Sequence, residues 1–216
     1  MKNLLTILTA AAAAALFSGC AGTGSLGSYN ADAHRPHNPG AVRVKVSLAN
    51  RAVYVLEGDR PLLVTATAIG LPEKPTPTGN FRVFNKIAQK RSGSYGFSVE
   101  GGGIRPCTSG QATGRYVGFP MAHWVEFAPG YGFHEGAVWP IPRTHGCLRL
   151  HKNVAAKFYA LTQNGTPVNI AHSQPEDATI GRNLRRPQDY RDPDPANAVL
   201  ISEAVFRGSG GSLFVD

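Results

Sequence analysis

A cysteine preceded by histidine and glycine is the most reactive feature of the sequence. The run is Thr144-His145-Gly146-Cys147-Leu148-Arg149. A thiol becomes a strong nucleophile when a nearby imidazole lowers its pKa and holds it as thiolate. Glycine lets the backbone approach a substrate carbonyl, so the amides of Gly146 and Cys147 could form an oxyanion hole. The pattern predicts a cysteine nucleophile that performs acyl transfer.

His134 is the expected base for this cysteine. It precedes Cys147 by thirteen residues, and Pro140 and Pro142 lie in between. Prolines favour turns, so we expect the chain to reverse there and bring both side chains to the mouth of one site. The alternative for His134 is a core histidine that donates to a backbone carbonyl.

Two other interpretations of the cysteine remain open. His134, His145 and Cys147 could bind zinc, but Val138 stands where a His-Glu-x-x-His helix would carry its second histidine. Cys147 could also pair with Cys107 in a disulfide, which is permitted outside the cytoplasm. Cys107 lies in a glycine-rich segment that predicts a flexible loop and an inert thiol. We expect no metal and no cofactor.

The elements that position these groups are predicted to be mainly β. Residues 42–48 alternate between apolar and polar side chains, which is the period of a half-buried strand. Composition and turn signals predict further strands at residues 52–57, 61–69, 81–84 and 167–171. The main helix is expected at 153–163, after the cysteine loop, with Asn153 as its cap.

The N-terminal residues predict export. One lysine precedes an apolar run over residues 4–17, which is too short to span a bilayer and has the layout of a secretory signal. The run Leu16-Phe17-Ser18-Gly19-Cys20 resembles a bacterial lipobox, with Phe17 in place of the usual leucine. A lipid on Cys20 would anchor the chain to a membrane. Because Ala21 follows instead of Asp, the resemblance implies the periplasmic face of the outer membrane. Ordinary cleavage, with Cys20 a plain thiol, is the alternative.

The chain therefore divides into four expected parts. They are a lipoprotein signal peptide (1–19), a flexible tether (20–40), a catalytic domain (41–172) and a Pro/Arg-rich C-terminal extension (173–216). About 130 residues suffice for one core in the third part. The extension is expected to wrap the domain or to be partly disordered, with a short helix at 197–206, and we assign it no chemistry.

The positive charge sets few limits on partners. The formal net charge is +8, and the basic residues are spread along the chain. Without a basic helix or an aromatic-interleaved patch, we expect no nucleic-acid binding. A mild attraction to anionic cell-envelope polymers and a basic surface kept for solubility both fit this charge. The sequence does not fix the oligomeric state.

The cysteine motif resembles the signature of the L,D-transpeptidases, the YkuD-type domain. That signature is a histidine followed by Ser/Thr-His-Gly-Cys-x-Arg or Asn, which matches His134 and the run 144–149. The segment Pro75-Thr76-Pro77-Thr78-Gly79-Asn80-Phe81 is similar to the family's Thr-Pro-x-Gly-x-Phe segment. The resemblance covers residues 42–170, nearly the whole expected domain.

The resemblance implies a β-sandwich-like fold and thioester chemistry on peptidoglycan stem peptides. Cys147 would attack the carbonyl between an L-centred diamino acid and D-Ala, D-Ala would leave, and an amine would take the acyl group. His134 would be the base, and His145 would line the site or polarise the substrate. Arg149 would orient the cysteine loop or bind a substrate carboxylate, and Thr144 would add a supporting hydrogen bond.

Two departures from the family pattern concern the acyl acceptor. Glu135 stands between His134 and Gly136, where the family usually has glycine directly after the histidine, and the spacing to Cys147 is shorter than usual. A trimmed loop could admit water or an unusual amine. The alternatives are an L,D-carboxypeptidase, a hydrolase that frees wall-linked proteins, and a non-catalytic wall-binding lipoprotein.

Overall fold

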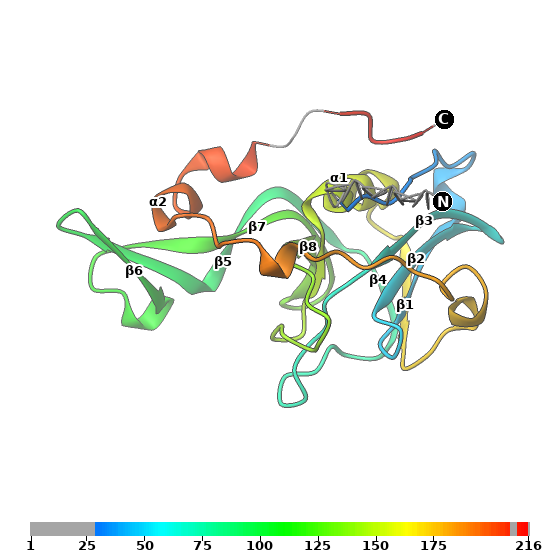
Figure 1. Ribbon diagram of the computed structural model, residues 1–216, viewed down its shortest axis with the longest axis horizontal. Helices are drawn as coiled ribbons and strands as arrows, with labels where there is room; N and C mark the ends of the chain where they lie inside the picture. Colours follow the sequence, from blue (N-terminus) through cyan, green and yellow to red (C-terminus); the bar gives the residue numbers. More distant parts are fainter. Residues whose placement is uncertain (1–28, 208–210, 216) are drawn as a thin grey trace, which may run out of the picture.

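Two five-stranded sheets form the framework of the computed structural model, which describes residues 29–207 and 211–215 (Figure 1). The first sheet has the order β3-β2-β1-β10-β4 and contains β1 (Val42–Ser47), β2 (Ala52–Glu57), β3 (Arg60–Ala66), β4 (Gly79–Arg82) and β10 (Pro167–Ala171). The second has the order β6-β5-β7-β8-β9 and contains β5 (Asn85–Glu100), β6 (Gly103–Thr108), β7 (Arg115–Ala128), β8 (Tyr131–Glu135) and β9 (Leu148–Leu150). The mainly β fold expected from the sequence is confirmed.

Alternation in β1 buries one face of the first sheet. Val42, Val44 and Val46 are at most 1% exposed, as the period of two predicts. β1 pairs in parallel with β10, so the last strand of the domain lies beside the first. This pairing places strands from both ends of the domain side by side inside the first sheet.

The helix α1 (Lys152–Leu161) follows the cysteine loop, as expected. Its cap is His151, whose side chain accepts a hydrogen bond from the backbone amide of Asn153, so the cap lies two residues before the expected one. The helix buries Val154, Phe158 and Leu161 in the core, and the Phe158 ring lies 4.4 Å from that of Phe133 on β8. Burial of each such side chain contributes about 1.5–3 kcal/mol and fixes the helix against the second sheet.

The second sheet contains strands that the sequence did not predict. Cys107 was expected in a flexible loop, but Gly103–Thr108 forms β6 and pairs with β5. No residue of β6 is buried, so this strand lacks the apolar alternation that reveals strands elsewhere. The pair β5–β6 projects beyond the rest of the sheet (Figure 1).

Residues 29–41 pack on the domain, which corrects part of the tether expected over 20–40. Tyr29 is 7% exposed, and its hydroxyl lies 3.0 Å from Oγ1 of Thr65. Ala33 is buried and forms an isolated bridge with Leu63. An aromatic ring and a paired backbone fix this segment to β3.

The C-terminal extension follows the surface of both sheets (Figure 1). It contains the short helix α2 (Asn197–Leu200) and the 3-10 helix η5 (Glu203–Phe206), where one short helix was expected. The guanidinium of Arg91, on β5, donates to the carbonyls of Leu200 and Ser202, both at 2.9 Å. These charge-assisted bonds attach the extension to the second sheet.

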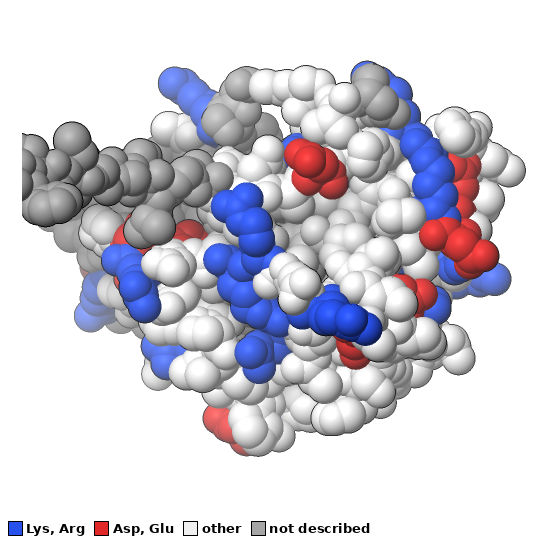
Figure 2. All heavy atoms as spheres, turned by 45° about the vertical axis from the view of Figure 1, so that its right-hand side comes forward, with Lys and Arg blue, Asp and Glu red and all other residues white. Residues whose placement is uncertain are grey.

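The expected signal peptide and Cys20 lie outside the described residues. Within the described part of the chain, no helix has the length and apolarity needed to cross a bilayer. On the face shown in Figure 2, Lys and Arg side chains gather in a central band, and acidic side chains are fewer and scattered.

Candidate active site

Thr144 holds the cysteine loop closed. Its hydroxyl donates to the carbonyl of Cys147 at 2.6 Å and accepts from the amide of Gly146 at 3.1 Å. Thr144 is 3% exposed, and its amide donates to the carbonyl of Ile69. The supporting role expected for Thr144 thus corresponds to two hydrogen bonds within the loop.

The same bonds show that the expected oxyanion hole cannot use both backbone amides. The amide of Gly146 already donates to Thr144, whereas the amide of Cys147 has no acceptor among the described residues. A free backbone N–H beside a nucleophile is suited to receive a developing oxyanion. Of the two expected donors, only Cys147 is therefore available.

Gly146 is required by both conformation and space. Its φ is +104°, which L side chains rarely adopt. A side chain there would overlap the ring of Tyr131 and would come within 3.1 Å of the carbonyl of Pro75. The loop is therefore enclosed between the first residue of β8 and the proline-rich segment.

His134 and Arg149 lie on one face of the second sheet, and Cys147 directly precedes the strand that carries Arg149. β8 and β9 pair in parallel, with His134 opposite Arg149 and Phe133 opposite Leu148. Phe133 and Leu148 are fully buried in the core. Because side chains alternate along a strand, His134 and Arg149 face the other way. The pairing of β8 with β9 thus joins residues that the sequence separates.

His134 is a neutral imidazole with a defined tautomer. Its Nδ1 lies 2.7 Å from the carbonyl oxygen of Glu135, which can only accept, so Nδ1 carries the proton and Nε2 the lone pair. Burial, assisted by the charge of Arg149, lowers the pKa of His134 to about 4. His134 thus makes the hydrogen bond to a backbone carbonyl that was expected of a core histidine. Because this bond uses Nδ1, Nε2 stays free to accept a proton.

The thiol of Cys147 is protonated at rest, which corrects the lowered pKa expected from the sequence. Burial raises its pKa and outweighs the opposing effects of the Gly132 amide and Arg149. Sγ lies 3.8 Å from the carbonyl oxygen of Gly130, and among the described residues it shares no hydrogen bond with His134. The resting pair is a neutral thiol and a neutral imidazole.

Arg149 is a half-buried cation without a counter-ion in the described part of the chain. Its side chain has no ion pair or hydrogen bond to any described residue, and burial, with the charge of Arg143 nearby, lowers its pKa. Its stem passes over Gly136, where a Cβ would lie 2.9 Å from Cδ of Arg149. Gly136 thus provides space for Arg149. The carboxylate of the neighbouring Glu135 lies 3.6 Å from Nδ1 of His123.

Residues 41–170 match the model of the L,D-transpeptidase catalytic domain, YkuD. The chain belongs to this family. No match was found among curated proteins.

Solved L,D-transpeptidase structures are similar to this chain at low identity. One from Stackebrandtia nassauensis is 18% identical, with a TM-score of 0.47, and the match covers 66% of this chain and 60% of that chain. A cysteine-to-serine mutant from Enterococcus faecium is 23% identical (TM-score 0.45; 61% of this chain and 50% of that chain). L,D-transpeptidase 1 from Mycobacterium tuberculosis is 22% identical (TM-score 0.44; 61% and 60%). The match thus spans less than two thirds of these proteins.

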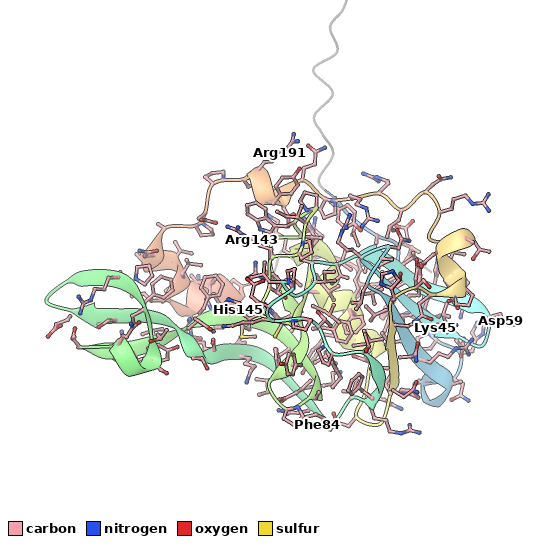
Figure 3. The ribbon with its side chains drawn as sticks, turned by 90° about the horizontal axis from the view of Figure 1, so that it is seen from below. Lys45, Asp59, Phe84, Arg143, His145 and Arg191 are labelled. Atoms are coloured by element: carbon pink, nitrogen blue, oxygen red, sulfur yellow. The ribbon has the colours of Figure 1, made fainter. Side chains whose placement is uncertain are left out.

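In this L,D-transpeptidase domain, His145 lies at the exposed rim of the site. Its ring is 4.8 Å from that of Tyr95 on β5, and Nζ of Lys74 donates to the Tyr95 hydroxyl at 3.3 Å. Partial burial and the charges of Lys74 and Arg149 lower the pKa of His145. His145 is therefore placed to line the site as a neutral group (Figure 3).

A cavity of about 420 Å³ lies beside the residues of the candidate site. Some of the residues that line it were not predicted from the sequence. His134 and Arg149 line one side of it, and Asp189, Tyr190 and Asp192 of the extension line another. The extension was expected to have no chemistry, yet it lines this cavity together with Trp139. The only sequence signal for this cavity was that Trp139 lies close to the cysteine motif in the chain.

Two further interpretations of Cys147 were left open by the sequence: a zinc site and a disulfide with Cys107. Cys107 and Cys147 are both free thiols in the structure, so no disulfide joins them. Among the described residues, no group of three or more His, Cys, Asp or Glu side chains is arranged to hold a metal ion.

Proposed function

We propose that this protein is a peptidoglycan L,D-transpeptidase. In this proposal Cys147 forms a thioester with a tetrapeptide stem, releases D-Ala and passes the acyl group to an amine. The observation that carries the proposal is a neutral His134 with a free Nε2, paired across β8 and β9 with Arg149, whose charge acts on the thiol of Cys147. The family match supports the reaction class.

The first step transfers a proton as the thiol attacks. Nε2 of His134 accepts the proton of Sγ, and Sγ forms a bond to the carbonyl carbon between the diamino acid and D-Ala. The amide of Cys147, free of other acceptors in the described structure, stabilises the oxyanion. The half-buried Arg149 attracts a substrate carboxylate, since it has no competing counter-ion among the described residues.

Collapse of the tetrahedral intermediate returns that proton. The C–N bond breaks, the His134 imidazolium protonates the leaving amine, and D-Ala departs. An acceptor amine then attacks the thioester, the C–S bond breaks, and the amine proton passes by way of His134 to the thiolate. The products are a new amide and the free thiol of Cys147.

We further propose that the enzyme works at a membrane, anchored by a lipid on Cys20, on the periplasmic face of the outer membrane. The support is the lipobox-like run before Cys20 and the absence of Asp after it. Replacing Cys20 with alanine is expected to move the protein from the membrane to the soluble fraction. An unchanged membrane fraction would contradict the anchor.

Incubation with a disaccharide-tetrapeptide tests the reaction by product mass. Dimers mean transfer, whereas loss of D-Ala alone means that water is the acceptor and the enzyme is an L,D-carboxypeptidase. The thioester requires that Cys147→Ala release no D-Ala and that the matched Cys107→Ala variant remain active. Continued D-Ala release by Cys147→Ala would refute it. A Cys147 that a carbapenem does not label would indicate a non-catalytic wall-binding protein.

A further inference from the structure

The sulfur of Cys147 contacts the hairpin formed by β7 and β8. The thiol donates to the carbonyl oxygen of Gly130, with Sγ at 3.8 Å, and the amide of Gly132 forms a hydrogen bond with the same sulfur. The carbonyl can only accept, so it holds the proton of the resting thiol, whereas the amide can only donate and favours the thiolate. The position of this hairpin therefore affects the stability of both states of the sulfur.

Backbone pairing in this hairpin is interrupted just before its turn. Pro129 and Gly130 connect the two strands, and the φ of Gly130 is +78°, a combination typical of a type II turn. Such a turn twists against the strands of a tight hairpin and splays them. The pairing register also shifts between Glu126 and Ala128, which marks a β-bulge. A side-chain contact is therefore needed to fix the turn relative to the sulfur.

Glu126 supplies this contact from β7. Its Oε1 accepts a hydrogen bond from the amide of Gly130 at 3.1 Å. Its Oε2 accepts from Nδ2 of Asn85 at 2.9 Å and from Nε1 of Trp124 at 3.1 Å. Burial would raise the pKa of this carboxyl, but the three hydrogen bonds outweigh that effect and lower it. Bonds to an ionised carboxylate are roughly twice as strong as neutral ones, so Glu126 holds the turn firmly.

The same carboxylate supports the second group that contacts the sulfur. Glu126 lies directly opposite Gly132 in the pairing of β7 with β8. The indole of Trp124 is 1% exposed, and a Cβ on Gly132 would lie only 2.8 Å from its Cζ2 atom. The ring whose Nε1 donates to Glu126 is thus packed against the backbone of Gly132. One carboxylate fixes Gly130 directly and Gly132 through the indole.

The charge of Glu126 opposes the effect of this positioning. Burial is the main cause of the raised pKa of the thiol, and the hydrogen bond from Gly132 is the largest effect in the opposite direction. Among the charged groups, Arg149 on β9 and Lys90 on β5 favour the thiolate, whereas Glu126 disfavours it by a smaller effect than that of Gly132. His134 on β8 is neutral at rest. Loss of the charge alone and loss of the positioning therefore change the thiol in opposite directions.

We propose that Glu126 is a positioning residue for Cys147, whose carboxylate fixes the turn between β7 and β8. With the turn fixed, the Gly130 carbonyl holds the resting thiol and the Gly132 amide stabilises the thiolate. The inference rests on the proposed function, in which Cys147 is the nucleophile. When the S–H bond breaks, the proton moves to Nε2 of His134. The electron pair left on the sulfur is stabilised by the Gly132 amide until it forms the bond to the substrate carbonyl carbon.

Alkylation of Cys147 by iodoacetamide at increasing pH tests this role in the full-length protein. The reagent is neutral and needs no peptidoglycan, so its rate follows the thiolate fraction, and peptide mass spectrometry separates Cys147 from Cys107. Glu126→Gln keeps the length of the side chain but offers one acceptor oxygen instead of two. Glu126→Asp keeps the charge but has a shorter reach. The matched control is Glu100→Gln, an exposed carboxylate of β5 that accepts a 2.8 Å hydrogen bond from Thr113.

We expect both Glu126 variants to slow the alkylation of Cys147 at pH 8 about three- to tenfold, because the sulfur loses the Gly132 hydrogen bond and its pKa rises further. Alkylation of Cys107 in the same molecules should be unchanged, as should both thiols in Glu100→Gln. The acid limit of carbapenem labelling should stay in place, because Glu126 is not among the groups that shift the pKa of His134.

Three results would overturn the positioning role. Faster alkylation of Cys147 in Glu126→Gln would show that this carboxylate acts through its charge alone. Wild-type rates in both Glu126 variants would show that it does not act on the sulfur. A shift of the acid limit together with the alkylation rate would show a general loosening of the site. If Glu126→Gln does not fold, Glu126→Asp decides, because its retained charge predicts a wild-type rate unless positioning matters.

Failure of the two proposals can be told apart. A wild-type protein that releases no D-Ala refutes the transpeptidase function, whereas the alkylation rates are measured without a substrate and decide the role of Glu126 by themselves. A wild-type protein that releases D-Ala, with Glu126 variants that are alkylated like the wild type, refutes the positioning role alone.

Discussion

Arg149 lies opposite His134 across the parallel pair of β8 and β9, and its charge helps to keep the imidazole neutral. A cation beside a histidine disfavours a second positive charge, and burial acts in the same direction. Burial also keeps the thiol of Cys147 protonated. The site at rest therefore stores its proton on sulfur and its lone pair on Nε2 of His134.

The acid limit of acylation follows from this arrangement. The pKa of His134 is about 4, below the ordinary value of 6.5, so the base stays unprotonated until the pH falls to about 4. We expect the rate of carbapenem labelling to be flat from pH 7 to 5 and to fall below pH 4.5. A rate that halves near pH 6.5 would contradict a depressed pKa.

Replacing Arg149 with glutamine tests the cause of the shift. Removing the guanidinium is expected to raise the pKa of His134 and move the acid limit of labelling toward pH 6.5, only part of the way because burial is the larger cause. Arg185→Gln, which removes an exposed cation outside the active-site cavity, is the control. If both variants leave the acid limit in place, Arg149 does not set it.

Replacing Thr144 with valine should weaken the cysteine loop. Valine keeps the volume but leaves the buried amide of Gly146 and the carbonyl of Cys147 without their side-chain partner. Unsatisfied groups of this kind cost about 1–3 kcal/mol, measurable as a lower urea midpoint, and labelling of Cys147 should slow as well. Thr144→Ser retains the hydroxyl and should recover both properties; a serine variant as impaired as valine would point to packing instead.

Replacing Gly146 with alanine should abolish labelling of Cys147. The new methyl group would overlap the Tyr131 ring, and the φ of +104° adds backbone strain. Gly101→Ala is the matched control, because its φ is +56° but a Cβ there meets nothing within 4 Å. The control should cost about 1–2 kcal/mol and keep full activity. Equal losses in thermal unfolding would show that φ alone, not the Tyr131 contact, decides.

Replacing Arg91 with alanine should release the extension near α2. Three guanidinium bonds to the carbonyls of Gly118, Leu200 and Ser202 are lost, and proteolysis within 197–207 should become faster. Arg82→Ala, which removes one exposed bond to the carbonyl of Gly165, should leave the cleavage rate unchanged. Unchanged cleavage in Arg91→Ala would mean that other contacts hold the extension.

The first sheet and α1 were predictable because local signals agree with the fold there. Val42, Val44 and Val46 alternate, and Phe158 shares a helix face with Leu161. The motif around Cys147 identified the family because its residues are adjacent in the chain. Local signals of this kind also give the order of the elements.

The rest depends on contacts between distant parts of the chain. β6 has no buried residue and therefore no alternation to detect. The stacking of Tyr190 on Trp139 joins the extension to the domain across about fifty residues, and no periodicity encodes such a contact. The raised pKa of Cys147 is likewise a consequence of burial, which only the folded structure defines.

The burial of Tyr29 limits the length of chain between the domain and the proposed lipid anchor. With the proposed lipid on Cys20, only eight residues lie between the anchor and Tyr29, where the chain enters the domain. A fully extended chain of that length spans about 30 Å. Under the proposed anchor, the domain would stay within this distance of the bilayer and would act on the layer of cell wall nearest the lipid surface.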